Sequence, residues 1–143
     1  MNRLVALCLP GGPSFVDVVQ RVWDEGDAVF PVDQRLPKQA QLDLIDHMGA
    51  SVVVDSSGAT PIAGRPVESG DALVVATSGS TGVPKGVVLT HDALAANARA
   101  TNSYIGVDST VDKWLACLPL SHVGGFSVIV RALHSEVDLE VHN

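Results

Sequence analysis

The sequence predicts an α/β fold in which a mostly parallel sheet carries helices on both faces. The first indication is that short apolar runs alternate with longer stretches whose apolar residues recur at helical spacing. The second is composition, because 46% of the 143 residues are hydrophobic, as expected of a globular chain with many buried strands. Clusters of Gly, Pro and Ser separate the runs and mark turns. A chain of this length suits one domain or one large subdomain.

Strands are expected over the apolar runs and helices over the amphipathic stretches. The predicted strands are Leu4–Leu9, Ala28–Val32, Ser51–Asp55, Ala72–Ala76, Gly86–Leu89, Trp114–Leu118 and Val137–Val141. The predicted helices are Pro13–Glu25, Pro37–Met48, a stretch that Thr90 caps and that reaches Ile105, and Val123–Leu133. The segment Ser56–Ser69 is rich in Ser, Gly and Pro, which predicts a surface connection.

Each predicted helix has one apolar stripe that would face the core. Pro13 suits a first helical turn and Gly49 suits the position after a last turn. The inward-facing sets are Phe15, Val19, Val22 and Trp23; Ala40, Leu44 and Met48; Leu94, Ala98, Thr101 and Ile105; and Phe126, Ile129 or Val130, and Leu133.

The charge and cysteine content exclude several classes of protein. The formal net charge is −7, so the chain gains no long-range attraction to nucleic acid or to anionic membranes. Cys8 and Cys117 both stand in apolar runs, which predicts two buried thiols and neither a disulfide nor a metal site. No apolar run has the roughly 20 residues of a membrane span, and the first residues make a poor signal peptide. A cytoplasmic protein is therefore expected.

The segment from Thr77 to His91, TSGSTGVPKGVVLTH, carries the chemistry. Four hydroxyl side chains stand within five positions, Thr77 to Thr81, with glycines at 79, 82 and 86 and one cation at Lys85. Glycines let a backbone approach a ligand closely, and hydroxyls, amides and an ammonium all donate hydrogen bonds. A loop that offers these groups to one small volume suits the phosphates of a nucleotide.

Two well-known phosphate loops do not match this segment. A Walker loop needs a Gly-Lys pair followed by Ser or Thr and then a helix, whereas here Pro84 precedes Lys85 and a strand follows. The dinucleotide-binding spacing of glycines is absent as well. The segment is instead expected to be a loop between two strands, which fits a flap over the phosphates.

The same segment resembles the signature phosphate loop of the adenylate-forming superfamily, which includes acyl-CoA synthetases, luciferases and nonribosomal peptide adenylation domains. Residues 5–55 resemble the opening of these enzymes, and WLACLPLSHVGGFSVIVRAL resembles the segment that shapes their acyl pocket. Within the superfamily, the phrase LPLSHVGG is similar to o-succinylbenzoate–CoA ligases, and a fatty-acyl-CoA synthetase is the other close match.

The resemblance implies roles for individual residues. The β- and γ-phosphates of ATP would be bound by Thr77, Ser78, Gly79, Ser80, Thr81, Gly82 and Lys85. Lys85 would also be catalytic, because its charge would stabilise the leaving pyrophosphate. His122 would orient the substrate carboxylate, and Gly124 and Gly125 would leave room for the acyl chain. The alternatives are a solvated lysine at 85 and a capping or core histidine at 122.

The resemblance also implies partners and domain organisation. ATP with Mg²⁺, CoA and a small carboxylic acid are expected as ligands, with no metal ligand in this chain and no nucleic acid. Residues 1–143 would be the N-terminal portion of an AMP-binding domain without its C-terminal lid, and therefore inactive alone. An exposed sheet edge and uncovered apolar surface are expected, through which the chain would self-associate. A nonribosomal peptide adenylation domain and a non-catalytic module that pairs with another chain remain as alternatives.

Overall fold

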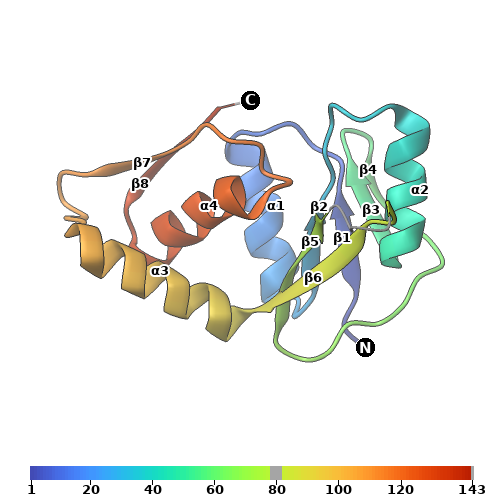
Figure 1. Cartoon of the computed structure of the whole chain (residues 1–143), viewed down its shortest axis with the longest axis horizontal. Coiled ribbons are helices and arrows are strands. Elements are labelled where there is room, and N and C mark those ends of the chain that lie inside the picture. Colours follow the sequence, from blue (N-terminus) through green and yellow to red (C-terminus); the bar gives the residue numbers. More distant parts are fainter. Residues whose placement is uncertain (78–81, 143) are drawn as a thin grey trace.

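The computed structural model describes residues 1–77 and 82–142, which form a six-stranded sheet, a two-stranded sheet and four helices (Figure 1). None of the helices in these ranges is long and apolar enough to cross a lipid bilayer. The elements in chain order are β1 (Leu4–Leu7), α1 (Pro13–Asp24), β2 (Ala28–Pro31), α2 (Lys38–Met48), β3 (Val52–Asp55), β4 (Gly58–Pro61), β5 (Asp71–Thr77), β6 (Lys85–Thr90), α3 (His91–Ile105), β7 (Lys113–Ala116), α4 (Val123–Ser135) and β8 (Asp138–Val141).

The larger sheet has the strand order β4-β3-β1-β2-β5-β6. Its four inner strands run parallel, and the two edge strands β4 and β6 pair antiparallel with their neighbours. The smaller sheet pairs β7 with β8 in parallel, and α4 connects these two strands. The prediction of an α/β fold with a mostly parallel sheet is therefore confirmed.

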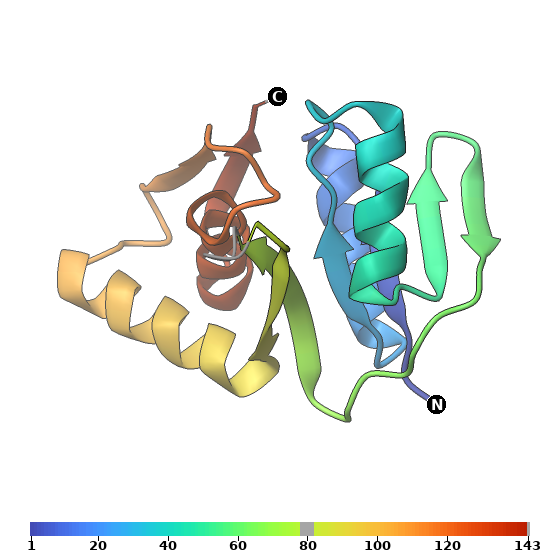
Figure 2. The same cartoon turned by 45° about the vertical axis from the view of Figure 1, so that its right-hand side comes forward.

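Alternation along the inner strands sends side chains into two apolar cores. In β1, Val5 and Leu7 pack with α1, α3 and α4, whereas Leu4 and Ala6 pack with α2. Figure 2 shows α1 and α2 on opposite sides of these strands. Helices thus cover both faces of the sheet, as predicted. Because both faces are buried, the inner strands are continuous apolar runs in the sequence.

Local signals place the ends of several elements. Pro13 opens α1, and Gly49 closes α2 in the left-handed conformation with φ of 76°. The predicted cap at Thr90 is confirmed, because its hydroxyl accepts a hydrogen bond from the Ala93 amide at 3.2 Å. This cap lies directly after β6 and therefore turns the chain from the sheet edge into α3.

The buried faces of α2 and α3 differ from the predicted stripes. Gln41 and Ile45 are the buried residues of α2, with Ala40, Leu44 and Met48 only partly buried. On α3, Ile105 is exposed, and Asn102 is buried one turn earlier. Its amide donates to the Arg131 carbonyl and to the Ser135 hydroxyl on α4, so α3 meets its neighbour partly through polar contacts. Apolar periodicity alone does not reveal a buried polar residue of this kind.

Two further expectations are wrong. Part of the predicted connection Ser56–Ser69 is the strand β4, whose residues are all exposed; it forms because its backbone pairs antiparallel with β3. Cys8 is buried as expected, but Cys117 is exposed. The reason is that β7 ends at Ala116, so Cys117 belongs to the segment that leads to α4 rather than to the predicted strand.

The strand β6 forms an exposed edge of the larger sheet. Val87 and Val88 are about half exposed, as is Val83 just before the strand. The expected exposed edge with uncovered apolar surface is therefore confirmed. The basis for expecting self-association is that an unpaired strand can accept another strand. Self-association through this edge stays a prediction.

Candidate functional site

The predicted phosphate loop joins two paired strands. Thr77 ends β5 and Lys85 begins β6, and these two residues are directly opposite each other in the antiparallel ladder. Residues 78–81, and with them the predicted ligands Ser78, Gly79, Ser80 and Thr81, lie outside the described residues. The expected position of the loop between two strands is confirmed, and the strands extend one residue further on each side than predicted.

The described residues of this hairpin are open to a ligand. Thr77, Gly82 and Lys85 are all exposed, and Gly82 has a φ of 77°, a conformation that glycine adopts without strain. The Thr77 hydroxyl donates to the Lys85 carbonyl at 3.1 Å, so its proton is used inside the hairpin. The side chain of Lys85 forms part of the exposed surface. The exposed lysine also fits its structural alternative, a solvated surface side chain.

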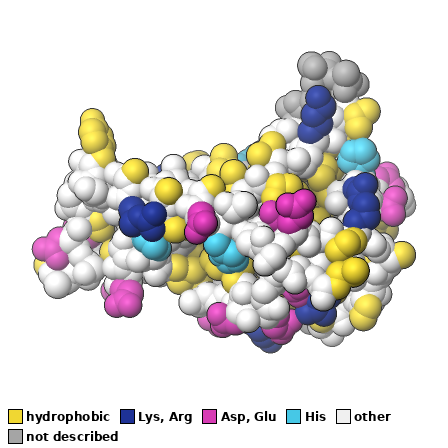
Figure 3. Space-filling model, turned by 90° about the horizontal axis from the view of Figure 1, so that it is seen from below, with side chains coloured by type: hydrophobic (Ala, Val, Ile, Leu, Met, Phe, Trp, Pro, Cys, Tyr) yellow, Lys and Arg dark blue, Asp and Glu magenta, His cyan; other side chains and the backbone are white. Residues whose placement is uncertain are grey.

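A wide open groove of about 1120 Å³ runs along one side of the hairpin. It is bounded by the end of α2, the segment 65–68 and the start of β6. The cationic side chains in its lining are those of Arg65 and Lys85, with His47 beside them, and Glu68 and Asp71 are the acidic ones. In Figure 3 the right-hand end of the visible face brings cationic, histidine and apolar side chains close together.

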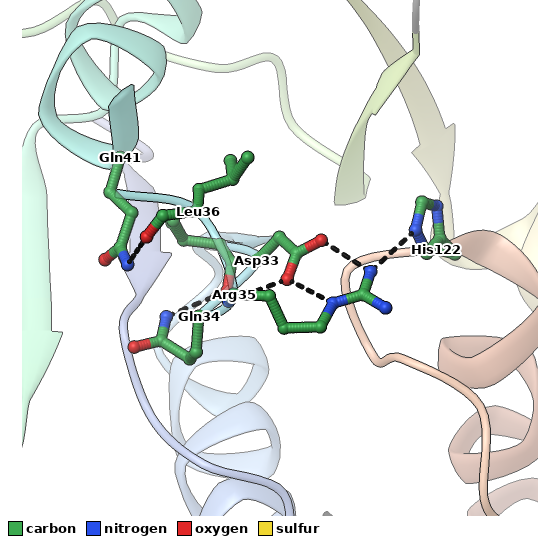
Figure 4. A network of polar contacts seen from close by, with 7 residues as sticks. Asp33, Gln34, Arg35, Leu36, Gln41 and His122 are labelled. Atoms are coloured by element: carbon green, nitrogen blue, oxygen red, sulfur yellow. Dashed lines mark hydrogen bonds and ion pairs between the residues drawn. The ribbon is translucent and has the colours of Figure 1, made fainter. Parts of the chain in front are cut away.

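The predicted carboxylate ligand His122 begins α4 as its N-cap residue. It is exposed, and its side chain makes no capping hydrogen bond, so neither a core nor a side-chain capping role describes it. Its Nε2 atom lies 3.5 Å from Nη2 of Arg35 (Figure 4). Because guanidinium groups only donate, this geometry favours a lone pair on Nε2 and a proton on Nδ1.

Arg35 is held in turn by Asp33, on the segment that follows β2. The guanidinium donates to the carboxylate through Nε at 2.9 Å and through Nη2 at 2.6 Å. These hydrogen bonds lower the pKa of Asp33 to about 2, so the carboxylate is ionised at neutral pH. An ion pair therefore faces His122 across the space between the segment after β2 and the loop before α4.

A smaller pocket of about 520 Å³ lies beside this ion pair. Its walls are the turn at 9–11, the segment 31–35 and the loop 117–121. The first two of these segments follow the carboxyl ends of the parallel strands β1 and β2. Ligands commonly bind at this end of the strands in α/β sheets. The pocket has a largely apolar wall with Asp33 and Arg35 at its rim.

The two glycines after His122 have different surroundings. Gly124 is exposed, and a methyl group there would lie 3.7 Å from Leu118, an ordinary contact. Gly125 is buried, and the same methyl group would lie 2.3 Å from the Pro119 carbonyl oxygen. Gly125 therefore lets α4 approach the backbone of the preceding loop. The space that its missing side chain leaves is occupied by that loop.

Comparison with known proteins identifies the family. The family model described as "AMP-binding enzyme" matches residues 54–139, more than half of the chain. The chain belongs to the AMP-binding enzymes. The match includes Lys85 and the whole of α4, so the two predicted parts of the site lie within the residues that the family model matches.

Two relatives of this chain have names from two functional groups. It is 39% identical over 108 residues to the probable non-canonical nonribosomal peptide synthetase CymA of Salinispora arenicola, which covers 71% of this chain and 1% of that protein. It is 41% identical over 70 residues to the probable 2-succinylbenzoate–CoA ligase of Mycobacterium tuberculosis, which covers 49% of this chain and 18% of that enzyme. The chain thus spans less than a fifth of the length of either relative.

Solved structures confirm the fold of this chain. The o-succinylbenzoate coenzyme A synthetase (MenE) of Bacillus subtilis, in complex with ATP and magnesium, superimposes with a TM-score of 0.80 at 21% identity. The superposition covers 100% of this chain and 45% of that one. The expected likeness to the N-terminal part of an adenylate-forming fold is therefore confirmed.

The predicted site residues fall in two places. Lys85 lines the large groove, whereas His122 stands next to Ser121 at the smaller pocket, and among the described residues neither hollow is lined by both Lys85 and His122. Sequence reasoning missed Asp33 and Arg35. The available signal was a pair of opposite charges two positions apart directly after a buried strand, where ligand-facing side chains collect in parallel sheets.

The described residues suit a nucleotide better than a metal ion. The exposed Lys85 ammonium and the backbone around Gly82 are groups that bind phosphate oxygens. Within residues 1–77 and 82–142 there is no cluster of three or more His, Cys, Asp or Glu side chains that could hold a metal ion. No residue is therefore assigned to Mg²⁺.

Proposed function

We propose that this chain is the phosphate-binding N-terminal portion of an adenylation domain that activates carboxylic acids. The substrate carboxylate oxygen attacks the α-phosphorus of ATP and displaces pyrophosphate, which gives an acyl-adenylate. A thiol then attacks the acyl carbon and displaces AMP, which gives a thioester. Residues outside this chain, in a C-terminal lid, complete the domain. The same proposal puts the enzyme in the cytoplasm, where ATP and CoA are available.

The observation that carries this proposal is the exposure of Thr77, Gly82 and Lys85 beside an open groove, in a chain of the AMP-binding family. Negative charge grows on the pyrophosphate as it leaves, and an ammonium already held nearby stabilises that charge without reorganising. Lys85 is the described residue that supplies it. Thr77, Ser78, Gly79, Ser80, Thr81 and Gly82 bind the β- and γ-phosphates in this proposal. Mg²⁺ accompanies the ATP, as it does in the MenE complex.

His122 and Gly124 contact the substrate in this proposal, whereas Gly125 acts through the packing of α4. The ring is exposed and makes no capping bond, so it is available to a ligand. With the Nε2 lone pair turned toward Arg35, the Nδ1 proton can be donated to a carboxylate oxygen. Gly124, which is open to solvent, leaves room for the acyl chain. Gly125 contributes by keeping α4 close to the loop, which fixes the position of His122.

The proposed product is a CoA thioester of a small aromatic or aliphatic acid. The 2-succinylbenzoate–CoA ligase of M. tuberculosis supports 2-succinylbenzoate, hence menaquinone biosynthesis, as the first acid to test, with fatty acids second. A nonribosomal peptide adenylation domain is the second candidate, because the match to CymA extends over 108 residues. In that case the substrate is an amino or related acid and the acceptor is a carrier-protein thiol.

The decisive assay is carboxylate-dependent ATP–pyrophosphate exchange by the natural protein that carries this chain, against a panel of 2-succinylbenzoate, fatty acids and amino acids. Lys85→Ala is expected to slow exchange by about 100-fold or more, which is the size of effect seen when one preorganised charge-stabilising donor is removed. Lys113→Ala is the matched control, since Lys113 is also an exposed first residue of a strand. Equal rates in the two variants would remove Lys85 from the mechanism. If no acid supports exchange and ATP does not stabilise the protein against unfolding, the chain is instead part of a non-catalytic module.

A further inference from the structure

The last turn of α2 makes a direct hydrogen bond to the phosphate-binding hairpin. His47 Nε2 lies 2.9 Å from the carbonyl oxygen of Pro84, the residue directly before Lys85. A carbonyl oxygen can only accept, so Nε2 carries the proton and donates it. The two residues are 37 positions apart in the sequence, and the contact therefore depends on how α2 packs against the edge of the sheet.

The helix end that carries His47 is itself fixed. Arg65 donates from Nη2 to the His47 carbonyl at 3.0 Å and from its backbone amide to the Gly49 carbonyl at 2.9 Å. Arg65 also packs against Gly49 so closely that a methyl group there would lie 2.5 Å from its Nε atom. The imidazole of His47 thus projects from a turn whose carbonyls are already bound by a neighbouring segment.

A second contact fixes the hairpin on the other side of Lys85. A methyl group on Gly86 would lie 2.9 Å from the sulfur of Met48 and 3.2 Å from a methyl group of Val74. A larger residue at 86 would require the Met48 side chain to shift. Neighbouring residues of α2, His47 and Met48, therefore contact the two neighbours of Lys85, Pro84 and Gly86.

We infer that His47 is a positioning residue for the phosphate site: by holding the Pro84 carbonyl it fixes the path of the chain into Lys85 before ATP binds. This inference rests on the proposed function of the hairpin. His47 does not contact the phosphates itself, and it acts through the backbone that carries Lys85. Where the path of the chain through Pro84 and Lys85 is already fixed, ligand binding has a smaller entropic cost of ordering.

Loss of the contact is expected to weaken ATP binding more than it slows the chemical step. One neutral hydrogen bond contributes enough for a change of about three- to tenfold in an equilibrium constant. In His47→Ala, the KM for MgATP in ATP–pyrophosphate exchange should therefore rise by about three- to tenfold. The kcat should change much less, because Lys85 still reaches the pyrophosphate once ATP is bound. His47→Gln keeps a donor of similar reach and should restore the wild-type KM.

The test measures both the hairpin and the activity in the natural protein that carries this chain. Hydrogen exchange of the peptide segment 82–90 should be faster in His47→Ala than in wild type and should return toward wild type in His47→Gln. His134→Ala is the matched control, because His134 is an exposed histidine in the last turn of another helix, α4. It should change neither the exchange of 82–90 nor the KM.

The possible outcomes separate this inference from the proposed function. Unchanged hydrogen exchange at 82–90 in His47→Ala overturns the inference, whatever the activity. Faster exchange at 82–90 with an unchanged KM in an active protein also overturns it, because the contact then does not serve ATP. A wild-type protein that catalyses no ATP–pyrophosphate exchange overturns the proposed function instead, and hydrogen exchange alone then decides whether His47 anchors the hairpin.

Discussion

The two glycines at the start of α4 give a prediction with its own internal control. Both are early helical residues, and alanine has the better helix propensity by roughly 1 kcal/mol at an interior position and less at a helix end. Their surroundings differ, because a methyl group on Gly125 would lie 2.3 Å from the Pro119 oxygen and 2.6 Å from the Leu118 oxygen. On Gly124 the nearest atom would be 3.7 Å away. Both substitutions therefore gain nearly the same helix propensity. Only Gly125→Ala places a methyl group too close to the backbone of the loop.

The size of the difference follows from these distances. An ordinary contact of a methyl group begins near 3.4 Å, so Gly125→Ala requires α4 and the loop to separate by about 1 Å at a point where both partners are backbone. Forcing extra atoms into a packed interior costs about 1–3 kcal/mol. Gly124→Ala, by contrast, is expected to be neutral or to stabilise by up to about 1 kcal/mol. The two variants should therefore differ by roughly 1–4 kcal/mol.

Urea or thermal unfolding of the wild-type chain and the two variants measures this difference. A change of 1 kcal/mol corresponds to roughly 2–4 °C in Tm for a chain of this size, so Gly125→Ala should melt several degrees below Gly124→Ala. Equal Tm values, or a more stable Gly125→Ala variant, would show that the loop yields without cost. Gly125 would then not be the residue that fixes the approach of α4.

Three further outcomes are expected. Asp27→Asn should lower the free energy of unfolding by about 1.5–3 kcal/mol, because this 3% exposed carboxylate accepts hydrogen bonds at 2.7 Å from the backbone amide and from Nε of Arg3, the residue before β1. The stability difference between wild type and Asp33→Asn should be full above about pH 5 and shrink as the pH falls toward 2, because hydrogen bonds from Arg35 lower the folded-state pKa to about 2. A thiol reagent should modify Cys117 quickly and Cys8 slowly in the folded chain, since Cys117 is exposed and burial raises the pKa of Cys8.

Each of these outcomes has a control or a contradicting result. Asp24→Asn, at an exposed position three residues before Asp27, should leave stability within about 0.5 kcal/mol of wild type. A stability difference for Asp33→Asn that grows below pH 4 would contradict the sign of the pKa shift, since a depressed folded-state pKa stabilises only the ionised form. Simultaneous modification of both thiols in the native chain would contradict the burial of Cys8.

Local patterns predicted the fold well. The apolar runs of β1, β2 and β5 and the stripe on α1 are encoded by residues next to one another or one turn apart, and the Thr90 cap depends on an amide three residues away. The boundaries were less exact, and β7 ends two residues before its predicted end at Leu118. This error in the boundary is the reason that the prediction for Cys117 was wrong. A residue in the loop after a strand has different surroundings from a residue within the strand.

The amino-acid sequence by itself determined the α/β class, the family and the position of the proposed phosphate loop between two strands. These properties depend on periodicity and on a contiguous string of residues, both of which can be read along the chain. Only the tertiary structure decided that Arg35 meets His122 across 87 positions and that His47 holds Pro84 across 37. Such contacts require two distant segments to arrive at one place. The spacing of residues along a chain carries no information about which of its exposed side chains will meet there.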